Sequence, residues 1–121
     1  MSLALFITGV IHMMPVIGVL GIERLQTLYG IDRVSDDLEL LLRHRAVLFG
    51  IIGCLMLYSL FESRLRLIAV SVGLASMLSF IALAQISDDI GPELKMVVWI
   101  DWICSVLLIA SILLQRFVHS D

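Results

Sequence analysis

Two long stretches of the sequence contain no charged residue. They cover residues 3–22 and 67–86, each twenty residues long, and their most polar side chains are His12 in the first and Gln85 in the second. At about 1.5 Å of rise per residue, a helix of this length crosses the hydrocarbon core of a bilayer, which is roughly 30 Å thick. The pattern therefore predicts two membrane-spanning helices.

Two further apolar stretches carry charge. The apolar residues 46–61 are too short to span a bilayer, and they reach spanning length only when the span starts near residue 40 (residues 40–61) and includes a cluster of basic residues. Residues 96–116 are long enough but contain Asp101. Backbone groups in lipid must be bonded within a helix or a closed barrel, and continuous apolar runs lack the alternation of barrel strands. We therefore predict an all-α fold: one integral membrane domain over residues 1–121, built as a four-transmembrane-helix bundle with antiparallel, up-down-up-down topology.

Capping and turn residues indicate where these helices begin and end. Asp36, followed three residues later by Glu39, predicts the start of the second span, and Pro92 predicts the start of the fourth. Gly30 is expected to end a first helix that continues beyond its membrane-spanning part. Pro15 is expected to bend that helix midway.

Composition agrees with a lipid environment. The chain has 121 residues, of which 60% are apolar and 16% charged, and its mean hydropathy is +1.07; a soluble domain is about a quarter charged. Eight basic residues against eleven acidic ones exclude a basic nucleic-acid binder. The cysteines, Cys54 and Cys104, are isolated, which excludes a disulfide scaffold or zinc module. The N-terminus lacks a basic segment, so the first span is expected to be a retained helix.

The polar groups inside the spans gather toward one side of the membrane, the side of the long connections. Measured from the opposite side at about 1.5 Å per residue, His12 lies roughly 15 Å deep, Asp101 roughly 22 Å and Arg45 roughly 25 Å. A charge in hydrocarbon normally faces the bundle interior and finds a partner, so Asp101 and Arg45 are predicted to pair directly. Glu39 stands four residues before Arg43, the order that favours an ion pair within one helix.

Each of these residues also has a purely structural interpretation. The arginines can extend to lipid headgroups while their stems stay in hydrocarbon. Asp101 can act only as a salt bridge between helices, and His44 can be a surface residue. His12 can donate to a backbone carbonyl or to Thr8, one turn earlier on the same face.

The sequence predicts no metal site and identifies no cofactor. His12, Met13 and Met14 are consecutive, so their side chains diverge on a helix and cannot converge on one ion. His12 and His44 differ in estimated depth by about 12 Å, which is too far for two axial ligands of one haem. No serine-protease-type triad, phosphate loop or metalloprotease helix is present, and whether the chain is an enzyme stays open.

Three segments carry a family resemblance. Residues 12–21 (HMMPVIGVLG), 23–30 (ERLQTLYG) and 41–50 (LLRHRAVLFG) resemble a family of small uncharacterised bacterial four-helix integral membrane proteins, some of which are labelled phosphopantetheine adenylyltransferase. Adenylyltransferases of that type are soluble α/β proteins with a His-x-Gly-His motif, which this sequence lacks, so the resemblance implies architecture and not activity. The matching residues are His12, Pro15, Glu23, Arg24, Tyr29, Gly30, Arg43, His44 and Arg45.

These observations predict a protein that binds a small amphiphilic or anionic ligand in a polar pocket at the long-loop end of the bundle. The predicted ligand-binding residues are His12, Glu23, Arg24, Glu39, Arg43, His44, Arg45 and Asp101. The basic residues of the second span would bind the head group, and Asp101 and Glu39 would position the arginines. His12 would contact a buried polar atom or transfer a proton.

Two other functions fit the same sequence. The first is a non-catalytic accessory or assembly subunit of a membrane complex, in which the charges fix helix register and small-residue faces recruit a partner. The second is a small transporter. The expected partners are the lipid bilayer, a lipid-like small molecule, and a second copy or another membrane protein, without nucleic acid. The expected location is the bacterial inner membrane.

Overall fold

The computed structural model describes residues 1–31 and 35–119, and these residues form helices without any strand. In chain order the elements are α1 (Ser2–Met13), the 3-10 helix η1 (Met14–Leu20), α2 (Ile22–Tyr29), α3 (Asp36–Tyr58), the 3-10 turn η2 (Ser63–Leu65), α4 (Arg66–Gln85) and α5 (Pro92–His119). The predicted all-α class is therefore confirmed.

Four helical segments in this part of the chain are long and apolar enough to cross a membrane. They are Ser2–Leu20, Asp36–Tyr58, Ser63–Gln85 and Pro92–Val118. The shortest has 19 residues, so each covers about 28 Å or more at the helical rise. By length and composition the chain is thus a multi-pass membrane protein with spans close to the four predicted from the sequence.

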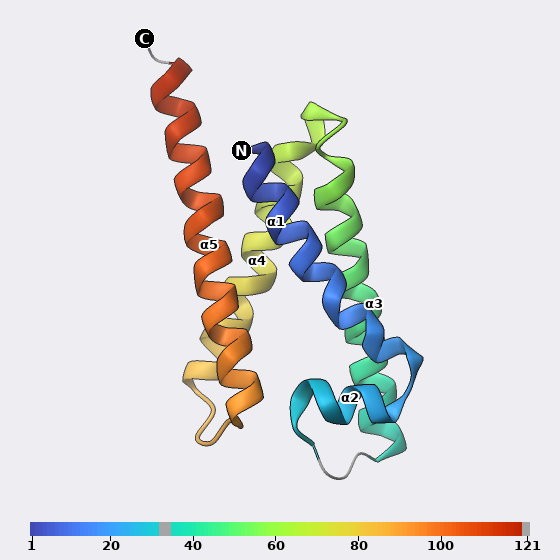
Figure 1. The fold of residues 1–121 in the computed structure, drawn as a ribbon. Coiled ribbons are helices and arrows are strands. Elements are labelled where there is room, and N and C mark those ends of the chain that lie inside the picture. The colour runs from blue at the N-terminus through green and yellow to red at the C-terminus, as the bar shows by residue number, and fades with distance from the viewer. Residues whose placement is uncertain (32–34, 120–121) are drawn as a thin grey trace.

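The bundle has two ends of different character. In Figure 1 the N-terminus and the turn between α3 and α4 lie at one end, and α2 and the connection between α4 and α5 lie at the other. We call these the turn end and the α2 end. Helix α1 packs against α3, α4 and α5, and α4 packs against α3 and α5.

The first span does not continue as one helix to residue 30, so this sequence prediction was wrong. The α-helix gives way to a 3-10 helix at Met14, just before Pro15, whose ring removes a backbone donor. The chain then breaks at Gly21, which has φ 147° and ψ 173°, a conformation that side chains disfavour. Helix α2 starts there as a separate element that packs against η1, α3 and α5, and in Figure 1 it lies across the bundle.

The predicted boundaries at Gly30 and Pro92 are confirmed, and the predicted start of α3 is wrong by one residue. Gly30 ends α2 in the left-handed conformation, with φ 62° and ψ 37°, and its N–H donates to the carbonyl of Gln26 at 2.8 Å. Pro92 is the first residue of α5. The start of α3 differs from the prediction by one residue, because the N-cap is Ser35: its hydroxyl accepts from the N–H of Leu38 at 3.3 Å.

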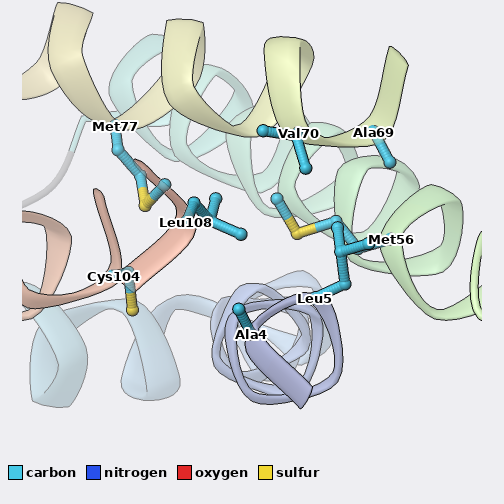
Figure 2. Close-up of a cluster of buried hydrophobic side chains, with 8 residues drawn as sticks. All are labelled: Ala4, Leu5, Met56, Ala69, Val70, Met77, Cys104 and Leu108. Atoms are coloured by element: carbon cyan, nitrogen blue, oxygen red, sulfur yellow. The ribbon is translucent and has the colours of Figure 1, made fainter. Parts of the chain in front are cut away.

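A cluster of buried apolar side chains fills the bundle toward the turn end. Its members, drawn in Figure 2, are Ala4, Leu5, Met56, Ala69, Val70, Met77, Cys104 and Leu108. They come from α1, α3, α4 and α5, so this cluster joins all four spans. In a bilayer such a core stabilises by close packing, since lipid tails are as apolar as the side chains themselves.

Close contact between α1 and α3 depends on two glycines. Gly9 and Gly53 are both buried, and a Cβ atom added at Gly53 would lie 3.0 Å from the carbonyl oxygen of Gly9 and 2.9 Å from Sδ of Met13. Small residues at such crossings let helix backbones approach in membranes. Gly9 and Gly53 therefore serve a contact within the chain.

We expect Gly53→Val to lower the free energy of unfolding by about 1–2 kcal/mol, because an added side chain must push α1 away from α3. Unfolding in mixed detergent micelles measures the change. The control is Ala82→Val on the exposed side of α4, which should leave stability unaltered. Equal stability of the two variants would contradict the close helix contact.

Candidate functional site

A cavity of about 160 Å³ lies at the α2 end, between α1, η1, α2, α3 and α5. Five polar residues line it: His12, Tyr29, Arg45, Glu93 and Asp101. Its apolar lining consists of Ile11, Met14, Pro15, Leu28, Phe49, Met96, Val97 and Ile100. The cavity is therefore mostly apolar with a few polar groups, the composition typical of small-molecule sites.

His12 is one of the most buried polar residues of the protein, with 2% of its surface exposed. Its Nδ1 lies 3.0 Å from the carbonyl oxygen of Thr8. A carbonyl only accepts, so Nδ1 carries the proton and donates, and Nε2 of the neutral ring is left as an acceptor. Nε2 is buried without a hydrogen-bond partner, and the ring lies 5.4 Å from the ring of Phe49.

Asp101 faces the same cavity from α5. Its side chain is 6% exposed, and Oδ2 has no hydrogen-bond partner. One turn nearer the turn end, the hydroxyls of Thr8 on α1 and Ser105 on α5 are also buried. An unpaired buried polar atom costs about 1–3 kcal/mol, so Nε2 of His12 and Oδ2 of Asp101 would each be stabilised by a polar partner in the cavity.

Arg45 lies among aromatic rings. Its guanidinium carbon is 4.7 Å from the ring centre of Phe80, 5.1 Å from that of Phe49 and 5.6 Å from that of Tyr29. Such distances allow cation–π attraction, which is strongest where water is excluded. The rings come from α2, α3 and α4, so Arg45 links three elements of the bundle.

The predicted direct pair between Arg45 and Asp101 is not formed. Both residues line the cavity, yet the ion pair found among the described residues joins Arg43 to Glu39 instead. The charge of Arg45 acts on Asp101 across the cavity. The estimated depths of Arg45 and Asp101 agree with their position at one cavity. However, aromatic rings, and not the carboxylate, lie beside the guanidinium.

Tyr29 and Glu93 belong to the site although the sequence argument did not include them among the binding residues. Tyr29 is 7% exposed at the end of α2. Burial raises the pKa of its phenol, and the positive charge of Arg45 opposes that shift, so the phenol keeps its proton at neutral pH. Glu93 lies in the first turn of α5. Their neighbours Gly30 and Pro92 indicated helix ends in the sequence, but not a cavity.

The remaining predicted site residues do not line the cavity. These are Glu23, Arg24, Glu39, Arg43 and His44. Glu23, Arg24, Arg43 and His44 are exposed, and Nη1 of Arg43 lies 3.4 Å from Oε1 of Glu39. The predicted pair within one helix is thus confirmed, but it belongs to the outside of the bundle.

We expect Arg43→Ala to change the free energy of unfolding by less than about 0.5 kcal/mol, because an exposed pair within one helix contributes little. Thermal unfolding of the purified variant measures this, with Glu39→Gln as the variant of the other partner. A loss several times larger in either variant would assign this pair a structural role that its exposure argues against.

Comparison with known proteins adds no assignment. Neither the family models nor the curated proteins match the sequence, and no solved structure matches the fold. The resemblance to small bacterial four-helix membrane proteins rests on its motif residues alone. Of these, His12, Pro15, Tyr29 and Arg45 line the cavity.

Proposed function

We propose that this protein is a ligand-binding membrane protein that holds a small amphiphilic molecule in the cavity at the α2 end. The observation that carries the proposal is the convergence of His12, Arg45 and Asp101, from three different spans, on one small cavity. Intramembrane ionisable residues are costly and mark functional sites. Together with the resemblance to small bacterial membrane proteins, the four apolar helices favour a location in a bacterial inner membrane.

The surroundings of Arg45 support a ligand that arrives from the bilayer. Arg45 and Phe49 line both the cavity and a second hollow of about 470 Å³ between α3 and α4. The second hollow includes Leu48, Val72 and Leu83, which are all exposed on the lipid-facing surface. An amphiphile dissolved in the membrane can therefore reach the wall of the cavity without crossing water.

The charges inside the cavity favour an uncharged polar head over an anionic one. Two carboxyl groups, those of Glu93 and Asp101, face a single guanidinium, that of Arg45. Like charge repels an anion at short range in a medium of low dielectric constant. Of the two ligand types predicted from the sequence, we therefore favour an uncharged amphiphile over an anion.

The packing argues against the two other functions considered. A transporter needs a polar path through the bundle, whereas the apolar cluster around Leu5, Met56 and Leu108 fills the interior toward the turn end. An assembly subunit would recruit a partner through faces of small residues, whereas Gly9 and Gly53 contact each other's helices within this chain. Both features therefore favour ligand binding over these two alternatives.

The test is to purify the full chain in mild detergent and identify any bound molecule by native mass spectrometry. Val97 lines the cavity, so Val97→Phe should fill it and remove the bound species. The matched control is Val10→Phe, at an exposed position of α1 that faces lipid. A bound molecule that survives Val97→Phe unchanged, or is lost equally in both variants, would contradict the proposed site.

A further inference from the structure

Two buried hydrogen-bond acceptors belong to residues that line one cavity. Nε2 of His12 is an acceptor because Nδ1 donates to the carbonyl of Thr8. The carboxylate of Asp101 is an acceptor in its charged form, and Oδ2 has no partner. Among the described residues His12 and Asp101 form neither a hydrogen bond nor an ion pair with each other, so each atom is left to accept from a donor on a ligand.

The rest of the cavity suits a single aromatic ring. Its volume is about 160 Å³, close to the roughly 150 Å³ of an engineered apolar cavity that accepts benzene. The ring of Phe49 and the thioethers of Met14 and Met96 line it, and such groups pack favourably against aromatic faces and edges.

We propose that the cavity recognises an uncharged hydroxylated aromatic ring, such as a phenol or hydroquinone head, whose O–H donates to His12 Nε2, while Asp101 accepts from a second donor where the ligand has one. This inference rests on the proposed function and names the chemical class of its ligand. His12 is then the residue that determines specificity for a single hydroxyl, because a ring without a donor leaves its Nε2 unpaired. The Tyr29 hydroxyl and the Arg45 guanidinium supply donors for any acceptor on the same ligand.

The experiment compares three probes of similar size on the full chain in lipid nanodiscs by fluorine NMR. The probes are para-fluorophenol, which has a donor; para-fluoroanisole, which has a methyl group in place of the proton; and para-fluorobenzoate, which is anionic. Empty nanodiscs correct for partition into lipid. We expect para-fluorophenol to bind saturably, at least about tenfold more tightly than para-fluoroanisole, because a buried acceptor left unpaired costs about that factor or more.

Two variants assign the preference to residues. His12→Leu should reduce binding of para-fluorophenol to the level of para-fluoroanisole, whereas Asp101→Leu should leave the preference for para-fluorophenol in place. The control His44→Leu changes an exposed histidine of α3 that does not line the cavity, and should leave the preference intact. If the cavity variants do not fold, the comparison of the three probes on the unaltered chain still tests the proposed ligand class.

Three results would overturn the inference: equal binding of para-fluorophenol and para-fluoroanisole, tightest binding of para-fluorobenzoate, or no saturable binding of any probe. The last result is expected if water alone satisfies the acceptors. None of these results by itself contradicts the proposed function, because that proposal is tested separately by a co-purified molecule and by its loss in Val97→Phe. A preference for para-fluorophenol that disappears in His12→Leu and persists in His44→Leu would establish the inference.

Discussion

Leu108→Ala is expected to lower the free energy of unfolding by about 2–4 kcal/mol. Leu108 is fully buried in the cluster that joins α1, α3, α4 and α5. Its truncation leaves a void among Met56, Met77 and Val70 that lipid cannot fill. Since hydrocarbon chains solvate leucine well, the loss comes from missing packing contacts more than from transfer, which places the effect below the largest values for soluble proteins.

The control for this prediction is Leu113→Ala on the same helix. Leu113 is 51% exposed, so lipid replaces the contacts that its side chain loses, and stability should change by about 0.5 kcal/mol or less. Reversible unfolding in mixed micelles of mild and denaturing detergent measures both variants. Similar losses at the two positions would mean that the cluster in Figure 2 does not hold the spans together.

The sequence predicted the spans because their cause is local. The length of an apolar segment and its lack of charge are properties of that segment alone, so they can be recognised without knowing which helices pack against it. The same holds for Gly30 and Pro92, whose own backbone preferences end α2 and begin α5. The break at Gly21 was not predicted, because glycine permits many conformations and the one adopted depends on where α2 packs.

The site was predicted in part, and the reason is geometric. Residue counts give depth along a helix, and depth correctly suggested that His12, Arg45 and Asp101 meet. Residue counts do not show which side of a helix faces the bundle interior. The sequence therefore could not distinguish the exposed Arg43 and His44 from Arg45, which lines the cavity. Tyr29 reaches the cavity only because α2 leaves the axis of the first span, which no single residue indicates.

The surroundings of Arg45 lead to the second large effect. Arg45→Met should lower the free energy of unfolding by about 2–3 kcal/mol, because three aromatic rings lose their attraction to the guanidinium. Tyr29 is one of the three, so α2 should also loosen from the bundle, and the chain near Gly30 should become easier to cleave by protease. The control is Arg43→Met, whose side chain is exposed.

Two further measurements separate ring contacts from charge alone. Lysine keeps the positive charge but lacks the planar group that stacks on aromatic faces, so Arg45→Lys should recover less than half of the lost stability. A double-mutant cycle of Arg45→Met with Phe80→Leu should give a coupling of about 1 kcal/mol, because that ring lies nearest the guanidinium. Full recovery with lysine, together with no coupling to Phe80, would show that Arg45 acts through its charge across the cavity, on Asp101, rather than through the aromatic rings.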